Sequence, residues 1–229
     1  MNTRRLGAAV ISALLLLTAG AQAQSQQFEA VYSLQGVSSS TAKAAMEDLF
    51  SDPVMEDAGV TLYAADFGVT NGSLKIVADF DNYAERAERD ERRRASHGWS
   101  RWQLAMEEAE FVGADMVSVV ADHGKPRHTA DYLLVYTLSV QDPAVYAAAL
   151  EEMNDALGNP GVLRLVALRS GSRAATHAVL IGGDDFAAVN EYMDKLYASD
   201  AFRTFVSKVR NIRSVVHIES YRKVGDWGY

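Results

Sequence analysis

Hydrophobic and polar residues follow one another in the second half of the chain in an order that predicts strands and helices. Residues 132–140 are rich in β-branched and aromatic side chains, which is typical of a strand. Residues 144–157 repeat an apolar residue every three or four positions, which indicates a helix, and Asp142-Pro143 is a common N-terminal signal. The remaining predicted elements are strands at 162–169 and 176–182, a long helix at about 186–210 and a strand at 214–224.

The first half of the chain predicts the same β-α-β-β-α-β order. Polar residues at 38–41 offer N-caps to a helix that ends at Phe50, and Asn71-Gly72 is a strong signal for a hairpin turn. The predicted elements are a strand at 28–36, the helix to Phe50, strands at 61–69 and 73–80, a helix at about 82–109 and a strand at 114–121.

The two halves also share residues, which indicates an internal repeat. Residues 31–34 (VYSL) match 135–138 (VYTL) at an offset of 104 residues. Residues 95–102 (ASHGWSRW) match 198–205 (ASDAFRTF) at an offset of 103, and both place two aromatic residues three positions apart. Residues three apart lie on one helix face, so we expect these aromatic pairs to be packing residues that both copies need. The period is far too long for a solenoid, and each copy should be a domain-sized unit.

A β-α-β-β-α-β unit is ferredoxin-like, with four antiparallel strands and both helices on one face of the sheet. The other sheet face also needs cover, and two copies in one chain can supply it to each other. We therefore predict an α+β protein in which two tandem ferredoxin-like repeats pack sheet to sheet as an intrachain α+β barrel. The repeats would occupy 28–121 and 132–229, with a linker at 122–131.

The element order and the Ala-Ser-x-x-aromatic-x-x-aromatic segment of the second helix resemble the dimeric α+β barrel superfamily. This superfamily includes antibiotic-biosynthesis-monooxygenase-like and stress-responsive domains. The resemblance covers Phe28 to about Val224. It implies that this chain carries as a fused pair what many relatives make from two subunits.

The N-terminal residues have the pattern of a secretory signal peptide. Arg4 and Arg5 precede an apolar run at 6–17, and Ala21-Gln22-Ala23 is a cleavage motif, so we expect a leader at 1–23 and a short tail at 24–27. The run is too short to span a bilayer, which favours cleavage over a stable membrane anchor. We therefore expect an exported protein, periplasmic or extracellular, that uses either the general secretory or the twin-arginine route.

Composition excludes several classes of partner and chemistry. Loss of Arg4 and Arg5 with the leader takes the formal net charge from −8 to −10, which opposes binding to nucleic acid or to an anionic membrane. The chain has no Cys, so it has no disulfide, no thiolate nucleophile and no Cys-ligated metal.

The last strand carries the first candidate site residues. Alternate residues of a strand share a face, so His217 and Glu219 lie together with Val215 and Tyr221. The opposite face of this strand is smaller and more apolar and is expected to meet the helices. We therefore predict that His217 and Glu219 point into the space between the two sheets.

Three further residues complete the candidate ligand-binding set. Arg164 lies on a neighbouring strand, and Tyr32 and Tyr136 are repeat mates on the first strand of each copy. A His-Glu-Tyr-Arg set in an apolar barrel would bind a small polar ligand or hold a base with a shifted pKa. The alternative is a charged strand edge open to solvent, with the tyrosines as packing residues.

No metal site is expected. His123 and His128 lie with Asp122 in the predicted linker, without a rigid element to fix their spacing. His97 stands where the second copy has Asp200, and it is either a polar residue at a helix kink or part of a site present in one copy.

Two classes of function remain. The first is a binding or structural module that holds a small hydrophobic or aromatic ligand, or none, without a resident cofactor. The second is an enzyme, because the resemblance implies cofactor-independent monooxygenases and haem-binding, chlorite dismutase-like tandem proteins. For haem, the resemblance makes His217 or His177 the ligand to test. The fused pair is compatible with a monomer or a homo-oligomer.

Overall fold

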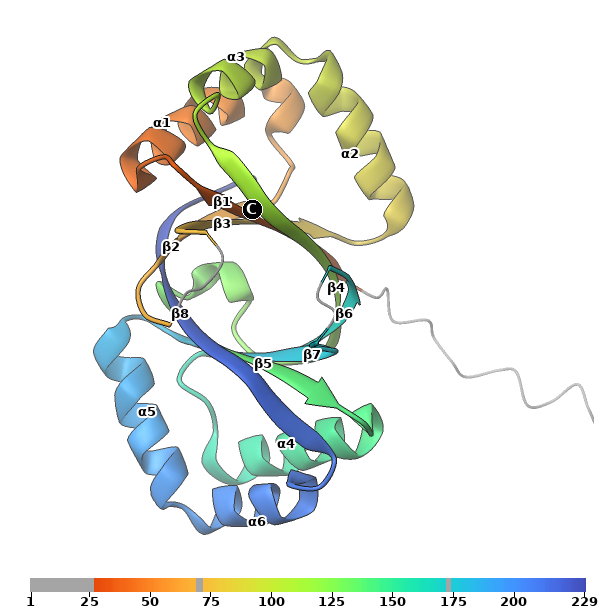
Figure 1. Ribbon diagram of the computed structural model, residues 1–229, viewed down its shortest axis with the longest axis vertical. Helices are drawn as coiled ribbons and strands as arrows, with labels where there is room; N and C mark the ends of the chain where they lie inside the picture. Colours follow the sequence, from red (N-terminus) through yellow and green to blue (C-terminus); the bar gives the residue numbers. More distant parts are fainter. Residues whose placement is uncertain (1–26, 69–71, 172–173) are drawn as a thin grey trace, which may run out of the picture.

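Strands whose side chains alternate between two apolar faces form the centre of the protein. The computed structural model describes residues 27–68, 72–171 and 174–229, so the predicted leader at 1–23 and the turn residue Asn71 lie outside the described residues. Within these ranges, eight antiparallel strands close into a barrel in the order β1-β3-β2-β8-β5-β7-β6-β4 (Figure 1). The prediction of an α+β barrel built from two β-α-β-β-α-β units is confirmed.

The bounds of the elements follow the predicted order in both halves. The first unit contains β1 (Phe28–Gln35), α1 (Ser39–Phe50), the 3-10 turn η1 (Pro53–Met55), β2 (Val60–Ala65), β3 (Leu74–Phe80), α2 (Tyr83–Ala95), α3 (His97–Ala105) and β4 (Glu110–Gly124). A second 3-10 turn, η2 (Arg127–Thr129), precedes the second unit. That unit contains β5 (Tyr132–Val140), α4 (Pro143–Leu157), β6 (Val162–Ser170), β7 (His177–Gly183), α5 (Phe186–Ala198), α6 (Asp200–Val209) and β8 (Arg213–Trp227).

The last strand of each unit joins the two units. β4 pairs with β1 of its own unit and with β6 of the other, and β8 pairs with β5 and with β2 in the same way. Both strands are 15 residues long, which lets each reach across two sheets. Because every strand is paired on both sides, the barrel leaves no open sheet edge.

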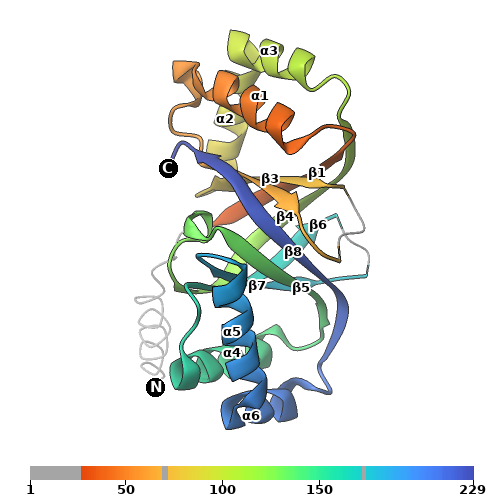
Figure 2. The same cartoon turned by 90° about the vertical axis from the view of Figure 1, so that its left-hand side faces the viewer.

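The helices form two outer layers on opposite sides of the barrel (Figures 1 and 2). Each layer packs on the outward face of its own unit and encloses a separate apolar core, one around Leu34, Leu62 and Trp102 and the other around Leu138 and Phe205. A further cluster lies inside the barrel and includes Tyr63, Val77, Leu133 and Tyr221. No helix in the described parts of the chain is long and apolar enough to cross a membrane.

The two long helices predicted from the sequence are each broken into two. Ser96 and Ser199 have extended backbone angles, and their side chains accept hydrogen bonds from the backbone N–H of Trp99 and Phe202. The repeated Ala-Ser segment is therefore an N-cap that starts a new helix in each unit. The helix periodicity continues across the break, so the apolar pattern alone did not reveal it. The expected packing role is confirmed, because Trp102 and Phe205 are 5% and 4% exposed.

Substitution of Ser199 tests the role of this cap. Ser199→Ala removes the acceptor for the Phe202 N–H and should lower the free energy of unfolding by about 1 kcal/mol, measured by urea denaturation. Ser199→Gly should lower the free energy of unfolding by only about 0.3 kcal/mol, because glycine is tolerated at N-caps. Ser207→Ala, on the exposed surface of α6, is the control and should change stability by less than about 0.5 kcal/mol. Equal losses in all three variants would contradict the capping role.

Candidate functional site

The barrel encloses a cavity of about 410 Å³, which we call the lumen. Its middle is walled by apolar side chains from strands of both units. These are Val31, Val77, Val117, Leu133, Val135, Val166, Leu168, Ala178 and Leu180. Ligand pockets in proteins commonly have this size and this mixture of apolar walls with a few polar groups.

Strand register separates the polar lumen residues into two groups. Glu29 pairs with Asp79 across β1 and β3, whereas Ser33, four residues further along β1, pairs with Lys75. Side chains at these two levels therefore lie at opposite ends of the lumen. We call the group Glu29, Asp79, Arg127 and Arg164 the arginine end, and the group Lys75, Asp115, His217 and Glu219 the lysine end.

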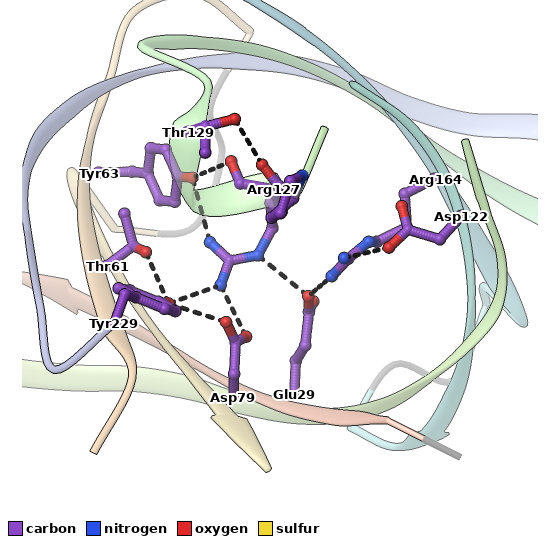
Figure 3. A network of polar contacts seen from close by, with 10 residues as sticks. Glu29, Thr61, Tyr63, Asp79, Asp122, Arg127, Thr129, Arg164 and Tyr229 are labelled. Carbon is purple, nitrogen blue, oxygen red and sulfur yellow. Dashed lines mark hydrogen bonds and ion pairs between the residues drawn. The ribbon is translucent and has the colours of Figure 1, made fainter. Parts of the chain in front are cut away.

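Arg127 closes the arginine end (Figure 3). Its side chain comes from η2 and is only 1% exposed. Nε lies 3.0 Å from Glu29, one terminal nitrogen lies 2.7 Å from Asp79, and the other donates to the Tyr63 hydroxyl at 3.1 Å. Burial alone would lower the pKa of Arg127, but Glu29 and Asp79 raise that pKa well above its usual value, so the guanidinium stays charged.

A second arginine shares the same carboxylate. Arg164, on β6, bonds both Glu29 and Asp122, so Glu29 bridges two guanidinium groups (Figure 3). Glu29 is itself 3% exposed. A buried charge is tolerated when it is paired and hydrogen-bonded. The charged groups of this network are paired in this way, and they come from β1, β3, β4, β6 and η2.

The C-terminal residue covers this network from outside. The Tyr229 hydroxyl lies 3.0 Å from Thr61 Oγ1 and donates to Asp79 at 2.8 Å, and its ring stacks on His128 with centroids 3.8 Å apart. Burial lowers the pKa of His128, which favours the neutral ring in this stack. Most donors and acceptors of the arginine end therefore bond one another, and among the described residues the buried Arg164 Nε has no hydrogen-bond partner.

The lysine end is arranged differently. Lys75 Nζ donates to Ser33 Oγ at 2.6 Å and lies 5.9 Å from the centre of the Tyr221 ring. The His217 Nε2 atom lies 3.7 Å from a Glu219 oxygen, beyond hydrogen-bonding distance. The side chain of His217 is 30% exposed and that of Glu219 is 15% exposed, so solvent reaches the lumen from this end.

Two buried polar atoms at this end lack a partner in good geometry. Within the described residues, His217 Nε2 makes no hydrogen bond, and the Tyr221 hydroxyl has only the nearby Glu219 carboxylate, outside good hydrogen-bond geometry. Burial and the nearby Glu219 carboxylate raise the pKa of Tyr221, so its hydroxyl remains protonated. Buried polar groups are normally satisfied, so these two atoms indicate a place where a ligand or water supplies the missing bond.

The structure brings some of the sequence-predicted residues together and separates others. His217 and Glu219 face the lumen as predicted, and Arg164 lies at its opposite end. Tyr32 and Tyr136 face the helices instead, which corrects the expectation that they belong to the inter-sheet set. Their neighbours Val31 and Val135 line the lumen, and adjacent strand residues point to opposite faces.

The two tyrosines line smaller cavities between the sheet and its helices. Tyr136 lines a cavity of about 220 Å³ and shares a hydrogen bond of 2.7 Å with the Tyr197 hydroxyl, and Tyr32 lines one of about 100 Å³ beside Trp99. The lumen is larger than either cavity and holds more ionisable groups, so it is the stronger candidate site.

One member of the predicted β8 face is displaced by a β-bulge. His217 pairs with Thr137, but the next β5 residue pairs with Val215, which leaves Val216 as an extra residue on β8. The bulge turns Val215 away from the lumen and toward the helix-side cavity, while Val216 lines the lumen. A single extra residue reverses the alternation beyond it, and nothing in the local sequence marks the position.

The sequence pattern does not reveal the lumen positions of Arg127 and Lys75. The sequence predicts that Arg127 lies in the linker. In the structure β4 extends to Gly124, three residues beyond its predicted end, and η2 then turns the Arg127 side chain into the barrel. Lys75 stands on the charged side of an otherwise apolar strand, and a lysine at such a position is a sequence signal for a paired or functional cation. Its position opposite Ser33 depends on strand pairing.

Metal and haem sites are not evident from the described residues. Within these ranges, no group of three or more His, Asp or Glu side chains is placed to hold a metal ion. His177 points away from the lumen, with Nδ1 2.9 Å from Thr176 Oγ1. His217 faces the lumen among Lys75 and two carboxylates, and this charged surrounding does not fit the apolar face of a haem group.

Comparisons by sequence do not assign the chain to a family. No protein-family model matches it. Glutamate 5-kinases of Pseudomonas fluorescens and Pseudomonas entomophila are 30% identical to it over 115 residues, which is 48% of this chain and 30% of each kinase. The chain thus spans less than a third of the length of these curated relatives, and their activity does not transfer.

Comparisons by structure support the fold across most of the chain. A candidate monooxygenase of Fusobacterium nucleatum superposes with a TM-score of 0.60 and 10% identity, covering 88% of this chain and 93% of that protein. An anthrone oxidase-like protein superposes with a TM-score of 0.54 and 13% identity, covering 88% of this chain and 92% of that protein. A haem-binding protein of Thermus thermophilus superposes with a TM-score of 0.50 and 9% identity, covering 86% of this chain and 91% of that protein. At these identities the likeness establishes the shared α+β barrel fold alone.

Removal of Arg127 tests whether the arginine end is structural. Arg127→Met leaves the buried Glu29 with one guanidinium fewer, so the free energy of unfolding should fall by about 3–5 kcal/mol in urea denaturation. Arg101→Met is the matched control, because Arg101 pairs with Asp48 on the surface, where solvent screens the pair, and its loss should change stability far less. A loss for Arg127→Met as small as that of the control would show that the network is not required for stability.

Proposed function

We propose that the protein binds a small, mostly apolar or aromatic molecule with one polar head group inside the barrel lumen. The observation that carries the proposal is the lumen itself, a cavity of about 410 Å³ with apolar walls and with His217 Nε2 and the Tyr221 hydroxyl at its solvent-reached end. The polar head would lie at the lysine end, beside His217 and Tyr221, and the apolar body would lie against the valines and leucines of the middle.

The difference between the two ends supports this orientation. Arg127 already bonds Glu29, Asp79 and Tyr63, so its guanidinium offers a ligand little hydrogen-bonding capacity. The lysine end is reached by solvent through the partly exposed His217. A ligand that enters there places its polar head at these atoms and its apolar part deeper in the lumen. Each square ångström of apolar surface buried there contributes about 25 cal/mol to the free energy of binding.

We further propose that this binding takes place outside the cytoplasm. The proposal rests on the sequence pattern of residues 1–23, which has the charged, apolar and small-residue parts of a secretory leader.

A substitution that fills the lumen tests the binding proposal. Ala178 lines the lumen on β7, so Ala178→Phe should place a ring in the binding space and abolish binding of 1-naphthol, followed by its fluorescence and by thermal shift. A ligand at 100 times its Kd should stabilise the unmodified protein by about 2.7 kcal/mol.

Ala187→Phe is the matched control, because it adds the same ring on the exposed surface of α5. It should leave naphthol binding unchanged. Binding that survives Ala178→Phe in a folded protein would move the site out of the lumen. Failure of the unmodified chain to bind naphthol or related aromatic compounds would remove the proposal.

A second candidate is an oxygen-dependent enzyme that needs no cofactor. The names of two structural neighbours, a candidate monooxygenase and an anthrone oxidase-like protein, favour it. The lumen adds a specific observation, since His217 and Glu219 lie 3.7 Å apart beside the apolar walls and would accept a proton from a bound aromatic ketone.

Oxygen uptake with anthrone as the probe distinguishes the enzyme from a binding module. If the second candidate is correct, the unmodified protein should consume dioxygen and His217→Phe should reduce the rate by at least about 100-fold, the lower range for loss of a general base. Naphthol binding without oxygen uptake would support the binding module and exclude anthrone oxidation.

A further inference from the structure

Lys75 combines a partly buried amine with access to the lumen. It comes from β3, and its Nζ donates to Ser33 across the β1–β3 pair at 2.6 Å. The Tyr221 ring, which also lines the lumen, has its centre 5.9 Å from Nζ. Other charged or titratable groups that face this amine are Asp115 from β4 and Glu219 from β8.

The surroundings of Lys75 favour the uncharged amine more than solvent does. Burial lowers the pKa of Lys75, and the Glu219 and Asp115 carboxylates offset only part of this effect. Lysine amines that are desolvated in apolar pockets are effective nucleophiles toward carbonyl carbon.

We infer that Lys75 Nζ forms a reversible imine with an aldehyde or ketone held in the lumen. This inference rests on the proposed ligand-binding function and names the chemical class of the ligand. A carbonyl compound has the required form, because its apolar body matches the walls and its carbonyl is the single polar head.

The charges around Lys75 favour a neutral carbonyl ligand over a carboxylate. Asp115 and Glu219 already surround the amine with two acidic groups, so an anionic ligand would meet repulsion at this end of the lumen. A neutral carbonyl carbon avoids that repulsion and presents an electrophile to Nζ.

The step balances without an oxidant or a reductant. The neutral amine attacks the carbonyl carbon, a C–N bond forms, and the carbonyl oxygen takes up a proton to give a carbinolamine. The nitrogen loses both of its protons over the two stages, the hydroxyl takes up the second proton, and the C–O bond breaks as water leaves and the C=N bond forms, so that one carbonyl compound and one amine give one imine and one water. His217 and Glu219, 3.7 Å apart, are placed at the same end to exchange these protons.

Reductive trapping tests the inference on the full chain. The protein is incubated with 2-naphthaldehyde and sodium borohydride, the intact mass is measured, and peptide mapping locates the modified lysine. The chain has six lysines, of which Lys43 is 49% exposed and Lys223 is ion-paired with Asp131 and Asp226. We expect one naphthylmethyl group per chain, with Lys75 labelled at least about tenfold faster than Lys43, because the lumen holds the aldehyde beside Nζ.

Two variants separate chemistry from binding. Lys75→Met removes the amine and should abolish the label while 1-naphthol still binds. Lys75→Arg keeps a cation without a usable nucleophile, so it should also lose the label and still bind 1-naphthol. This variant provides the test if Lys75→Met fails to fold. Ala178→Phe should abolish both the label and naphthol binding.

Failure of this inference can be told apart from failure of the proposed function. Naphthol binding with no label at Lys75, or with label spread evenly over the six lysines, would overturn the imine and leave the binding site in place. Absence of both naphthol binding and label would overturn the proposed function, and the imine with it.

Discussion

Each β-α-β-β-α-β unit has one sheet face covered by its own helices and one apolar face without cover, and burial of that second face is the constraint on which the structure depends. The chain meets it by placing the two uncovered faces opposite each other and by extending β4 and β8 across both sheets. The resulting closure also removes the exposed strand edges that two separate sheets would present.

Closure of the barrel creates an interior that apolar side chains only partly fill. The polar residues at the two ends of that interior differ in how they are bonded. At one end, Arg127 and Arg164 share Glu29. Arg127 also pairs with Asp79 and Arg164 with Asp122, so each buried guanidinium has two carboxylate partners. At the other end, ionisable groups face a cavity that solvent reaches. Stability and ligand chemistry are thereby assigned to opposite ends of one space.

The internal repeat explains which features the two halves share and which they do not. Asp115 and Glu219 occupy equivalent lumen positions, because each pairs with the repeat-related valine of β1 or β5. Lys75 has Ala178 as its counterpart, since these residues pair with the repeat-related Ser33 and Thr137. The acidic groups are thus present in both halves, whereas the amine is present in one, and the lumen is chemically asymmetric although the fold is nearly symmetric.

Local patterns in the sequence were sufficient for the order of strands and helices, the duplication, and the placement of His217 and Glu219 on the inner face of the last strand. They were insufficient for Tyr136, because both faces of its strand are apolar and the alternation alone does not say which one meets the helices. They were also insufficient for Arg127 and Lys75. The partners of these two cations lie on strands and turns distant in the sequence, and they meet only when β4 and β8 cross between the units and close the barrel.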